Sequence, residues 1–298
     1  MSIVITGASG FIGSHLLKAA RAAYGDTVTA FSSRVLDGRH IVYANMKDFS
    51  LAPTELALVE EAKVLIHAGA FTPKSGAEAN QIKCCNSNIS FTEELLALPW
   101  RNLEKIIFLS TLDVYANCNG PISETTLTVP TTLYGMSKLY CERIMGLYAT
   151  EGSIAMQVLR IGHVYGPGEE QYAKVIPKAI ERIISGGDVE LWGEGNELRS
   201  FIYIHDVVTA ILKAVELQEE PGVINVVGGN AISIRDLLEK LITICDSQTK
   251  IVQRDFSTTS RDLVFDNTKL KRYLLPMESD FTAGLRAEVA HMKSIHQW

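Results

Sequence analysis

Short apolar segments rich in β-branched residues alternate with longer amphipathic segments along the first half of the chain. The apolar segments predict buried strands at residues 2–6, 27–32, 41–44, 64–68, 106–110 and 155–160. The segments between them predict helices at residues 11–24, 54–61, 80–98 and 131–150. Because strands and helices alternate, the predicted fold is α/β, a doubly wound parallel sheet of the Rossmann type with helices on both faces.

The regularity loosens after Gly166-Pro167-Gly168. Helices are predicted at residues 172–185, 206–217 and 233–245, strands at residues 189–192 and 223–227, and further helical stretches toward the end. We expect residues 1–165 to form a dinucleotide-binding Rossmann domain, and segments around residues 201–228 are candidates to return to it. Residues 166–298 are expected to form mainly a smaller C-terminal substrate-binding domain.

Composition and charge narrow the class of protein. The 298 residues are 47% hydrophobic and 21% charged, as in ordinary soluble globular proteins, and the net charge of −6 argues against nucleic acid as a partner. No apolar segment is long enough to span a membrane, and the first residues lack the features of a signal peptide. The five cysteines show no metal-ligand spacing. Free thiols in the cytoplasm, with no metal and no membrane partner, are therefore expected.

A strand, a glycine turn and a helix start follow one another at residues 3–13. Gly7 allows a sharp turn, Gly10 a close approach of the backbone to a pyrophosphate, and Gly13 tight packing of the helix on the sheet. The free N–H groups and the dipole of the helix N-terminus favour the pyrophosphate. A tight turn without a ligand is the alternative, but three glycines at this spacing favour a dinucleotide. The predicted cofactor contacts of this loop are Gly7, Ser9, Gly10, Phe11, Ile12 and Gly13.

The end of the second predicted strand bears on which dinucleotide is bound. An NAD site usually carries an acidic residue there for the ribose 2′-hydroxyl. This chain has Ser32, Ser33 and Arg34 instead, whose hydroxyls and guanidinium suit a 2′-phosphate. The sequence therefore favours NADP as the cofactor, although a solvated loop arginine is the alternative and the nearby Asp37 keeps NAD possible.

Tyr134 and Lys138 are four residues apart in a predicted helix, so both face the same side. A phenol is a poor base at neutral pH, but a nearby ammonium and an oxidised nicotinamide both favour the phenolate. A tyrosine held in this way can exchange a proton with a sugar hydroxyl or carbonyl while hydride passes to or from the cofactor. The strand at residues 106–110 ends beside Thr111, whose hydroxyl is placed to bind the same oxygen. Thr111, Tyr134 and Lys138 are therefore the predicted catalytic residues, unless Ser110 and Thr111 only cap the strand end.

The motifs together resemble the extended short-chain dehydrogenase/reductase group, in the NAD-dependent epimerase/dehydratase family of nucleotide-sugar epimerases and 4-ketoreductases. The matching segments occur in family order over nearly the whole chain. They are TGASGFIG at residues 6–13, HAGA at 67–70, STLDVY at 110–115, YGMSK at 134–138, LRIGHVYGPG at 159–168, RSFIYIHDV at 199–207 and RDLVFDNTKL at 261–270.

The resemblance implies further site residues. It implies that Thr111, Tyr134 and Lys138 match the family triad, with Tyr134 and Lys138 also beside the cofactor and Thr111 beside the substrate. The other cofactor contacts that it implies are Asn45, Met46, His67, Ala68 and Gly69. Arg199 and Arg261 fall where the family binds the diphosphate of a sugar nucleotide, although ion pairs with Asp206 and Asp262 are the alternative. The family habit implies a homodimer through the helices predicted at residues 80–98 and 131–150.

Departures from the family pattern narrow the reaction. Dehydratase members carry Thr-Asp-Glu where this chain has Thr111-Leu112-Asp113, and Leu112 has no acid for a leaving hydroxyl, so sugar 4,6-dehydration is not expected. His163 stands where many members carry an asparagine that touches the substrate, so it is either a substrate contact or a loop histidine. Cys118 lies in a region where some epimerases place an acid/base cysteine, although a bystander thiol is the favoured interpretation.

Two enzyme reactions and one non-catalytic role fit these residues. The first is reduction of a 4-keto-6-deoxy sugar nucleotide by NADPH, and the second is C4 epimerisation of a nucleotide sugar with a recycled cofactor. The cofactor pocket favours the reductase, whereas the general motif set with both arginines favours an epimerase of the UDP-glucose type. A regulatory dinucleotide-binding protein is the third possibility, but it would not need Thr111, Tyr134 and Lys138.

Overall fold

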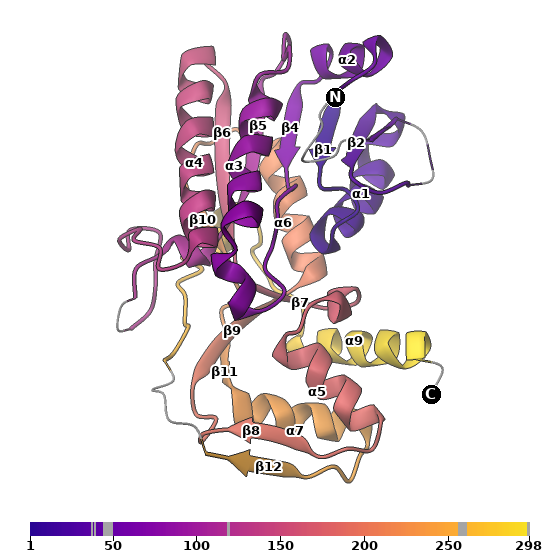
Figure 1. The fold of residues 1–298 in the computed structure, drawn as a ribbon, viewed down its shortest axis with the longest axis vertical. Coiled ribbons are helices and arrows are strands. Elements are labelled where there is room, and N and C mark those ends of the chain that lie inside the picture. The colour runs from indigo at the N-terminus through magenta and orange to yellow at the C-terminus, as the bar shows by residue number, and fades with distance from the viewer. Residues whose placement is uncertain (37, 39, 44–49, 118–119, 256–260, 297–298) are drawn as a thin grey trace.

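The structure is a computed structural model that describes residues 1–36, 38, 40–43, 50–117, 120–255 and 261–296. Its main element is a seven-stranded sheet in the order β10-β6-β5-β4-β1-β2-β3, in which every pair of neighbours is parallel (Figure 1). The strands are β1 (Ile3–Thr6), β2 (Val28–Ser32), β3 (Ile41–Tyr43), β4 (Val64–His67), β5 (Lys105–Thr111), β6 (Ala155–Ile161) and β10 (Ile224–Val226). The predicted doubly wound parallel sheet is therefore confirmed. The strand order reverses between β1 and β4, which opens a crevice for ligands at their carboxyl ends.

Helices cover both faces of this sheet because each turns an apolar side to it. On one face, α1 (Phe11–Tyr24) and α6 (Ile204–Glu216) share a core with the strands, to which α1 contributes Leu16, Leu17 and Ala20. On the other face lie α3 (Ile82–Leu96) and α4 (Leu133–Gly152), which run side by side (Figure 1). The short helix α2 (Pro53–Glu60) adds Val59 to the core on this second face.

The second half of the chain builds a separate core. Helices α5 (Val175–Ile184), α7 (Ile234–Cys245) and α9 (Phe281–His296) pack together with β8 (Val189–Trp192), below the main sheet in Figure 1. Strand β8 pairs with β12 (Ile251–Arg254). A three-stranded sheet in the order β11-β9-β7 lies between this core and the main sheet, with β7 (His163–Tyr165), β9 (Leu198–Tyr203) and β11 (Ala231–Ser233).

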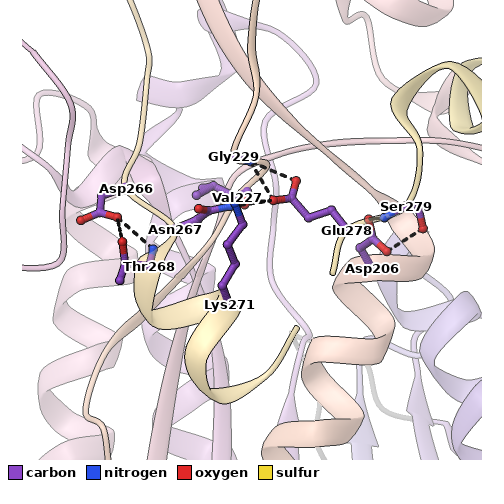
Figure 2. A network of polar contacts seen from close by, with 9 residues as sticks. All are labelled: Asp206, Val227, Gly229, Asp266, Asn267, Thr268, Lys271, Glu278 and Ser279. Atoms are coloured by element: carbon purple, nitrogen blue, oxygen red, sulfur yellow. Dashed lines mark hydrogen bonds and ion pairs between the residues drawn. The ribbon is translucent and has the colours of Figure 1, made fainter. Parts of the chain in front are cut away.

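A network of hydrogen bonds joins the segment before α9 to α6 and to the loop after β10 (Figure 2). The Glu278 carboxylate accepts hydrogen bonds from the backbone N–H of Gly229, which follows β10, and from Nδ2 of Asn267, which precedes α8 (Thr268–Tyr273). The next residue, Ser279, donates from its N–H at 2.9 Å and its hydroxyl at 2.7 Å to Asp206 in α6. These bonds hold the segment before α9 against α6 and the edge of the main sheet.

Most of the predicted elements match within one to three residues at each end, and four strands, β7, β9, β11 and β12, had no predicted counterpart. The helix predicted from residue 172 begins only at Val175, because residues 172–174 line the cavity described below and the N–H of Lys174 bonds to the carbonyl oxygen of Tyr172. Strand β10 and helix α6 both belong to the main-sheet layer. Among the described residues, no helix is both long enough and apolar enough to cross a membrane.

Candidate active site

A cavity of about 740 Å³ opens where the strand order reverses. Its walls come from the glycine loop after β1, the loop after β4, the end of β5 and the start of α4. Residues 171–174 and 261–265 close it on the side of the second core. Ligands of doubly wound sheets bind at this position, so the cavity is the candidate site for a dinucleotide and a substrate together.

The glycine loop has the geometry that close backbone contact requires. Gly7 has a φ of +70°, and a Cβ there would lie 2.6 Å from the backbone of Gly69. A Cβ on Gly13 would lie 2.0 Å from the carbonyl oxygen of Gly7. Helix α1 begins after Gly10 without a side-chain cap, so its first N–H groups are open to the cavity. These features fit the pyrophosphate of a dinucleotide. The predicted contacts Ser9, Phe11 and Ile12 also line the cavity.

The residues predicted to select NADP separate into two groups. Ser33 and Arg34 line the cavity, and both are exposed. Ser32 is 1% exposed, and its hydroxyl bonds to the backbone of Arg34 instead of facing the cavity. It donates to the carbonyl oxygen of Arg34 at 2.7 Å and accepts a hydrogen bond from the N–H of Arg34 at 3.0 Å. Of the predicted set, the structure therefore leaves one hydroxyl and one guanidinium at this part of the cavity. The predicted contacts Asn45 and Met46 lie outside the described residues, as do Asp37 and Cys118.

His67 is the last residue of β4, and Ala68 and Gly69, which follow it, line the cavity. The His67 ring is fully buried between Thr6, at 2.7 Å from Nδ1, and Thr92, at 3.0 Å from Nε2. Burial and the nearby Lys138 ammonium hold the pKa of His67 well below its usual range. The imidazole is therefore a neutral hydrogen-bonding link inside the protein, and its contribution to a cofactor site comes through the backbone that it anchors.

The predicted catalytic residues meet in the cavity. Thr132 caps α4 by accepting a hydrogen bond from the N–H of Gly135, so Tyr134 lies in the first turn of the helix and Lys138 one turn further. Tyr134, Lys138 and Thr111 are at most 9% exposed, and all three line the cavity. The Lys138 ammonium lies 4.2 Å from the centre of the Phe108 ring.

The electrostatics of the phenol favour its protonated form. Burial raises the pKa of Tyr134 above its usual range and the Asp113 carboxylate raises it further, whereas the hydroxyls of Thr72 and Thr111 act in the opposite direction. Burial also lowers the pKa of Lys138 to about 8. The sequence predicts that an ammonium and an oxidised nicotinamide together lower the pKa of the phenol, whereas the protein's own groups raise it, because burial is the largest influence. Tyr134 is therefore prepared to donate a proton.

Sequence reasoning missed several members of this site, among them Thr72, Asp113 and Lys174. The side chain of Asp113 is reached by solvent through the mouth of the cavity, but the walls displace enough water to raise its pKa, against the attraction of Arg261 and Lys174. Asp113 stands two residues after Thr111, at the carboxyl end of β5. Its place just after a strand of a parallel sheet was the feature of the sequence that could have indicated a position beside the site. Nothing in the sequence around Thr72 indicates its position.

Of the predicted substrate contacts, His163 and Arg261 line the cavity and Arg199 does not. His163 lines the cavity, its Nδ1 is buried without a hydrogen bond, and burial lowers its pKa to about 4, so it is neutral at physiological pH. Arg261 lines the cavity and donates to Oδ1 of Asn117. Arg199 donates to the carbonyl oxygens of Leu198 at 2.9 Å and of Arg261 at 2.7 Å, and does not line the cavity. Its guanidinium thus supports the backbone that carries Arg261.

A pair of buried acids lies behind the cavity wall. Glu169 and Glu288 are 2% and 1% exposed and interact with each other, and burial raises the pKa of Glu288 to about 9 and of Glu169 to about 7. Oε2 of Glu169 and both oxygens of Glu288 have no hydrogen bond of ordinary geometry among the described residues. A proton shared by the two carboxyl groups supplies a donor where both would otherwise only accept. On the cavity side, the Lys174 ammonium is 3.4 Å from Glu169.

The family model named NAD dependent epimerase/dehydratase family matches residues 3–227. The chain belongs to this family. A dTDP-4-dehydro-6-deoxyglucose reductase of Escherichia coli is 27% identical over 80% of each chain. The structure of UDP-N-acetylglucosamine 4-epimerase from Methanobrevibacter ruminantium, in complex with UDP-N-acetylmuramic acid, is 27% identical with a TM-score of 0.85 and covers 100% of this chain and 99% of its own.

A second solved structure bears on the cofactor. UDP-glucuronic acid 4-epimerase from Bacillus cereus, in complex with NAD, is 25% identical with a TM-score of 0.84 and covers 100% of this chain and 98% of its own. These likenesses extend over the whole described fold and include members of both reaction types, so they establish the family without selecting the reaction.

Proposed function

We propose that this protein is an NADP-dependent reductase that converts a 4-keto-6-deoxy sugar nucleotide to the corresponding alcohol at C4. The observation that carries the proposal is the placement of the buried Tyr134 phenol in the cavity wall, where burial and the Asp113 carboxylate raise its pKa and so favour the acid form. A reductase needs an acid there from the start of each turnover. An epimerase needs a base first, and the raised pKa of Tyr134 opposes that step except as far as the positive charge of an oxidised nicotinamide offsets it.

The residues of the chain then have separate roles. The nicotinamide supplies hydride chemistry when bound along the glycine loop. Tyr134 donates its proton to the oxygen at the reacting sugar carbon, and the Thr111 hydroxyl binds the same oxygen. Lys138 lies in the next helical turn, and its pKa near 8 makes it a source from which the phenol regains a proton. Arg261 and Lys174, on the opposite wall, attract the diphosphate of the substrate.

NADP is the proposed cofactor because Ser33 and the exposed Arg34 line the cavity at the end of β2. A guanidinium at this point pairs with a phosphate oxygen and has no comparable partner on an unmodified ribose. The related epimerase from Bacillus cereus binds NAD, so the choice of dinucleotide is a property to be tested on this chain.

C4 epimerisation of a nucleotide sugar is the second candidate, and the whole-length likeness to two 4-epimerases favours it. The deciding experiment incubates the purified protein with 4-keto-6-deoxy sugar nucleotides and NADPH, and separately with UDP-hexoses without added cofactor. Consumption of NADPH in step with product supports the reductase. Interconversion of UDP-hexoses without net change in cofactor would overturn it in favour of the epimerase.

We also propose a homodimer formed through α3 and α4. Helix α4 carries Met136, Tyr140 and Leu147 at exposures of 49%, 45% and 65%, and Ile82 at the start of α3 is 65% exposed. Exposed apolar groups on two adjacent helices favour burial against a second copy. Light scattering of the wild type and of Leu147→Glu tests this, with a monomeric variant as the expected result.

A cytoplasmic location is proposed from the four described cysteines, all of them free thiols.

A further inference from the structure

Three segments that line the cavity are joined to one another in a closed ring. They are the glycine loop after β1, the loop after β4, and residues 171–174 before α5. The first two segments meet beside the sheet, where the N–H of Gly69 donates to Oγ1 of Thr6 at 2.9 Å. Their backbones are so close there that a Cβ on Gly7 would lie 2.6 Å from Gly69. This joint is firm, because it follows directly from two paired strands, β1 and β4.

The other two joints of the ring hold residues 171–174, and they differ in strength. Tyr172 packs against the buried Phe11 of the glycine loop, with the ring centres 6.2 Å apart. The next residue, Ala173, donates its N–H to the carbonyl oxygen of Lys74 in the loop after β4, at 3.3 Å. Both Ala173 and Lys74 are exposed. Since this joint rests on a long hydrogen bond that water can replace, it is the weakest of the three.

The strand order places this ring across the path of a bound dinucleotide. In the main sheet, β1 and β4 are neighbours and lie between β2 and β5. Ser33 and Arg34, proposed for the adenosine end, follow β2. Tyr134, proposed for the nicotinamide end, lies at the start of α4 and lines the cavity with Thr111 at the end of β5. A dinucleotide that extends from one side to the other, with its pyrophosphate at the glycine loop, therefore passes through the ring.

We infer that the contact between Ala173 and Lys74 is a clasp that must open before a dinucleotide can enter or leave the protein. Both ends of a dinucleotide are bulkier than its pyrophosphate, so a closed ring retains it. The part free to move is residues 74–77, which are exposed, whereas Tyr172 stays packed on Phe11. The consequence for turnover rests on the proposed function, because a reductase exchanges its dinucleotide in each cycle and an epimerase keeps it.

The test joins the two sides of the clasp covalently. A backbone hydrogen bond brings the Cα atoms of its two residues to within about 6 Å, a spacing that a disulfide spans. The double variant Lys74→Cys with Ala173→Cys is loaded with NADPH and oxidised, and its release into excess NADP⁺ is followed by NADPH fluorescence. We expect release to be at least about 100-fold slower than from the same protein after reduction. Protein that is cross-linked while empty should bind NADPH more slowly by a similar factor. A short bifunctional thiol reagent joins the pair where oxidation does not.

Two controls separate a clasp from a distorted site. Adenosine 2′,5′-bisphosphate has only the adenosine end and does not pass through the ring, so the cross-link should leave its binding rate and affinity unchanged. The single variants, given the same oxidant, report on native thiols such as Cys84 and should release NADPH at the reduced rate. If the protein prefers NAD, the same measurements use NADH, NAD⁺ and AMP.

A second variant weakens the clasp without a cross-link. The N–H of Lys174 donates to the carbonyl oxygen of Tyr172 at 2.9 Å, and Ala173 between them does not have a positive φ. A three-residue turn of this kind gives its central residue a φ of about −75°, which proline adopts. Tyr172 has the extended backbone that precedes a proline, with φ −107° and ψ 139°. Ala173→Pro therefore removes the N–H of the clasp, and both binding and release of NADPH should become about 3-fold faster or more. Ala173→Ser keeps the N–H and should match the wild type.

Unchanged release from the cross-linked protein overturns the inference, as does a cross-link that slows adenosine 2′,5′-bisphosphate equally. Wild-type rates in Ala173→Pro also overturn it. These measurements contain no sugar, so the two proposals fail separately. Absence of turnover with every nucleotide sugar overturns the proposed function, whatever the exchange rates, and leaves the clasp standing.

Discussion

The Glu169–Glu288 pair makes the stability of the fold depend on pH in an unusual direction. Most carboxyl groups bind protons less tightly in a folded protein than in the unfolded chain. Here the folded pKa values are raised, to about 9 for Glu288 and about 7 for Glu169, from an ordinary value of 4.5. The folded state therefore retains protons that the unfolded chain has lost. The resulting stabilisation is fully present below pH 4.5 and is lost as the pH rises through the folded pKa values.

The size of the effect follows from one retained proton. While the folded state holds one proton more than the unfolded chain, each rise of one pH unit lowers the unfolding free energy by about 1.4 kcal/mol. Between pH 6 and pH 8, the single proton on Glu288 therefore accounts for a loss of about 3 kcal/mol. Glu288→Gln removes this proton while an amide N–H replaces it as a donor to Glu169. The variant is expected to lose less stability than the wild type over the same range.

Urea denaturation followed by tryptophan fluorescence, at half-unit pH steps from 6 to 8, measures the unfolding free energy of both proteins. Other groups also titrate in this range, so the quantity of interest is the difference between the two slopes. Glu151→Gln is the matched control, because Glu151 is exposed at the C-terminal end of α4, and it should retain the wild-type slope. Parallel curves for the wild type and Glu288→Gln would refute the shared-proton reasoning.

Three further predictions concern the cavity. Tyr134→Phe is expected to reduce turnover by at least about 100-fold while dinucleotide binding, measured by fluorescence titration, stays near normal; near-normal turnover would remove Tyr134 from the mechanism. Arg34→Ala is expected to weaken NADPH about 10- to 100-fold and NADH little, as measured by calorimetry, because only the phosphate loses a charged partner; equal weakening would contradict a phosphate clamp. Gly13→Ala places a Cβ 2.0 Å from the carbonyl oxygen of Gly7, so the loop must shift and dinucleotide affinity should fall sharply, whereas Gly146→Ala, with nothing within 4 Å of its Cβ, should bind normally.

The sequence predicted well those parts of the fold that depend on local periodicity. The strands of the main sheet are mostly apolar runs and α1 has a clear apolar face, so both were found with accurate ends. Strand β9 has no regular alternation of apolar and polar residues, and its partners β7 and β11 are short and distant in sequence. Pairing of this kind depends on tertiary contacts, and a single sequence contains no local signal for it.

In the site, too, the sequence predicted where residues lie along their elements but not where each side chain points. Residue spacing placed Tyr134 and Lys138 on one face of a helix, and both line the cavity. Spacing does not say where an individual side chain turns, and Ser32 and Arg199 both bind neighbouring backbone. The pKa of Tyr134 depends on burial, a property of the assembled cavity that no motif contains.

The position of β10 at the edge of the main sheet has a consequence for synthesis of the protein. Strand β6 ends at Ile161, but its outer neighbour begins at Ile224, and the helix that completes one face of the core, α6, lies between them. A nascent chain that has emerged only as far as β6 therefore exposes the apolar surface that α6 and β10 later cover. Such a chain is a natural substrate for chaperones, and the first core can close only after about three quarters of the polypeptide has left the ribosome.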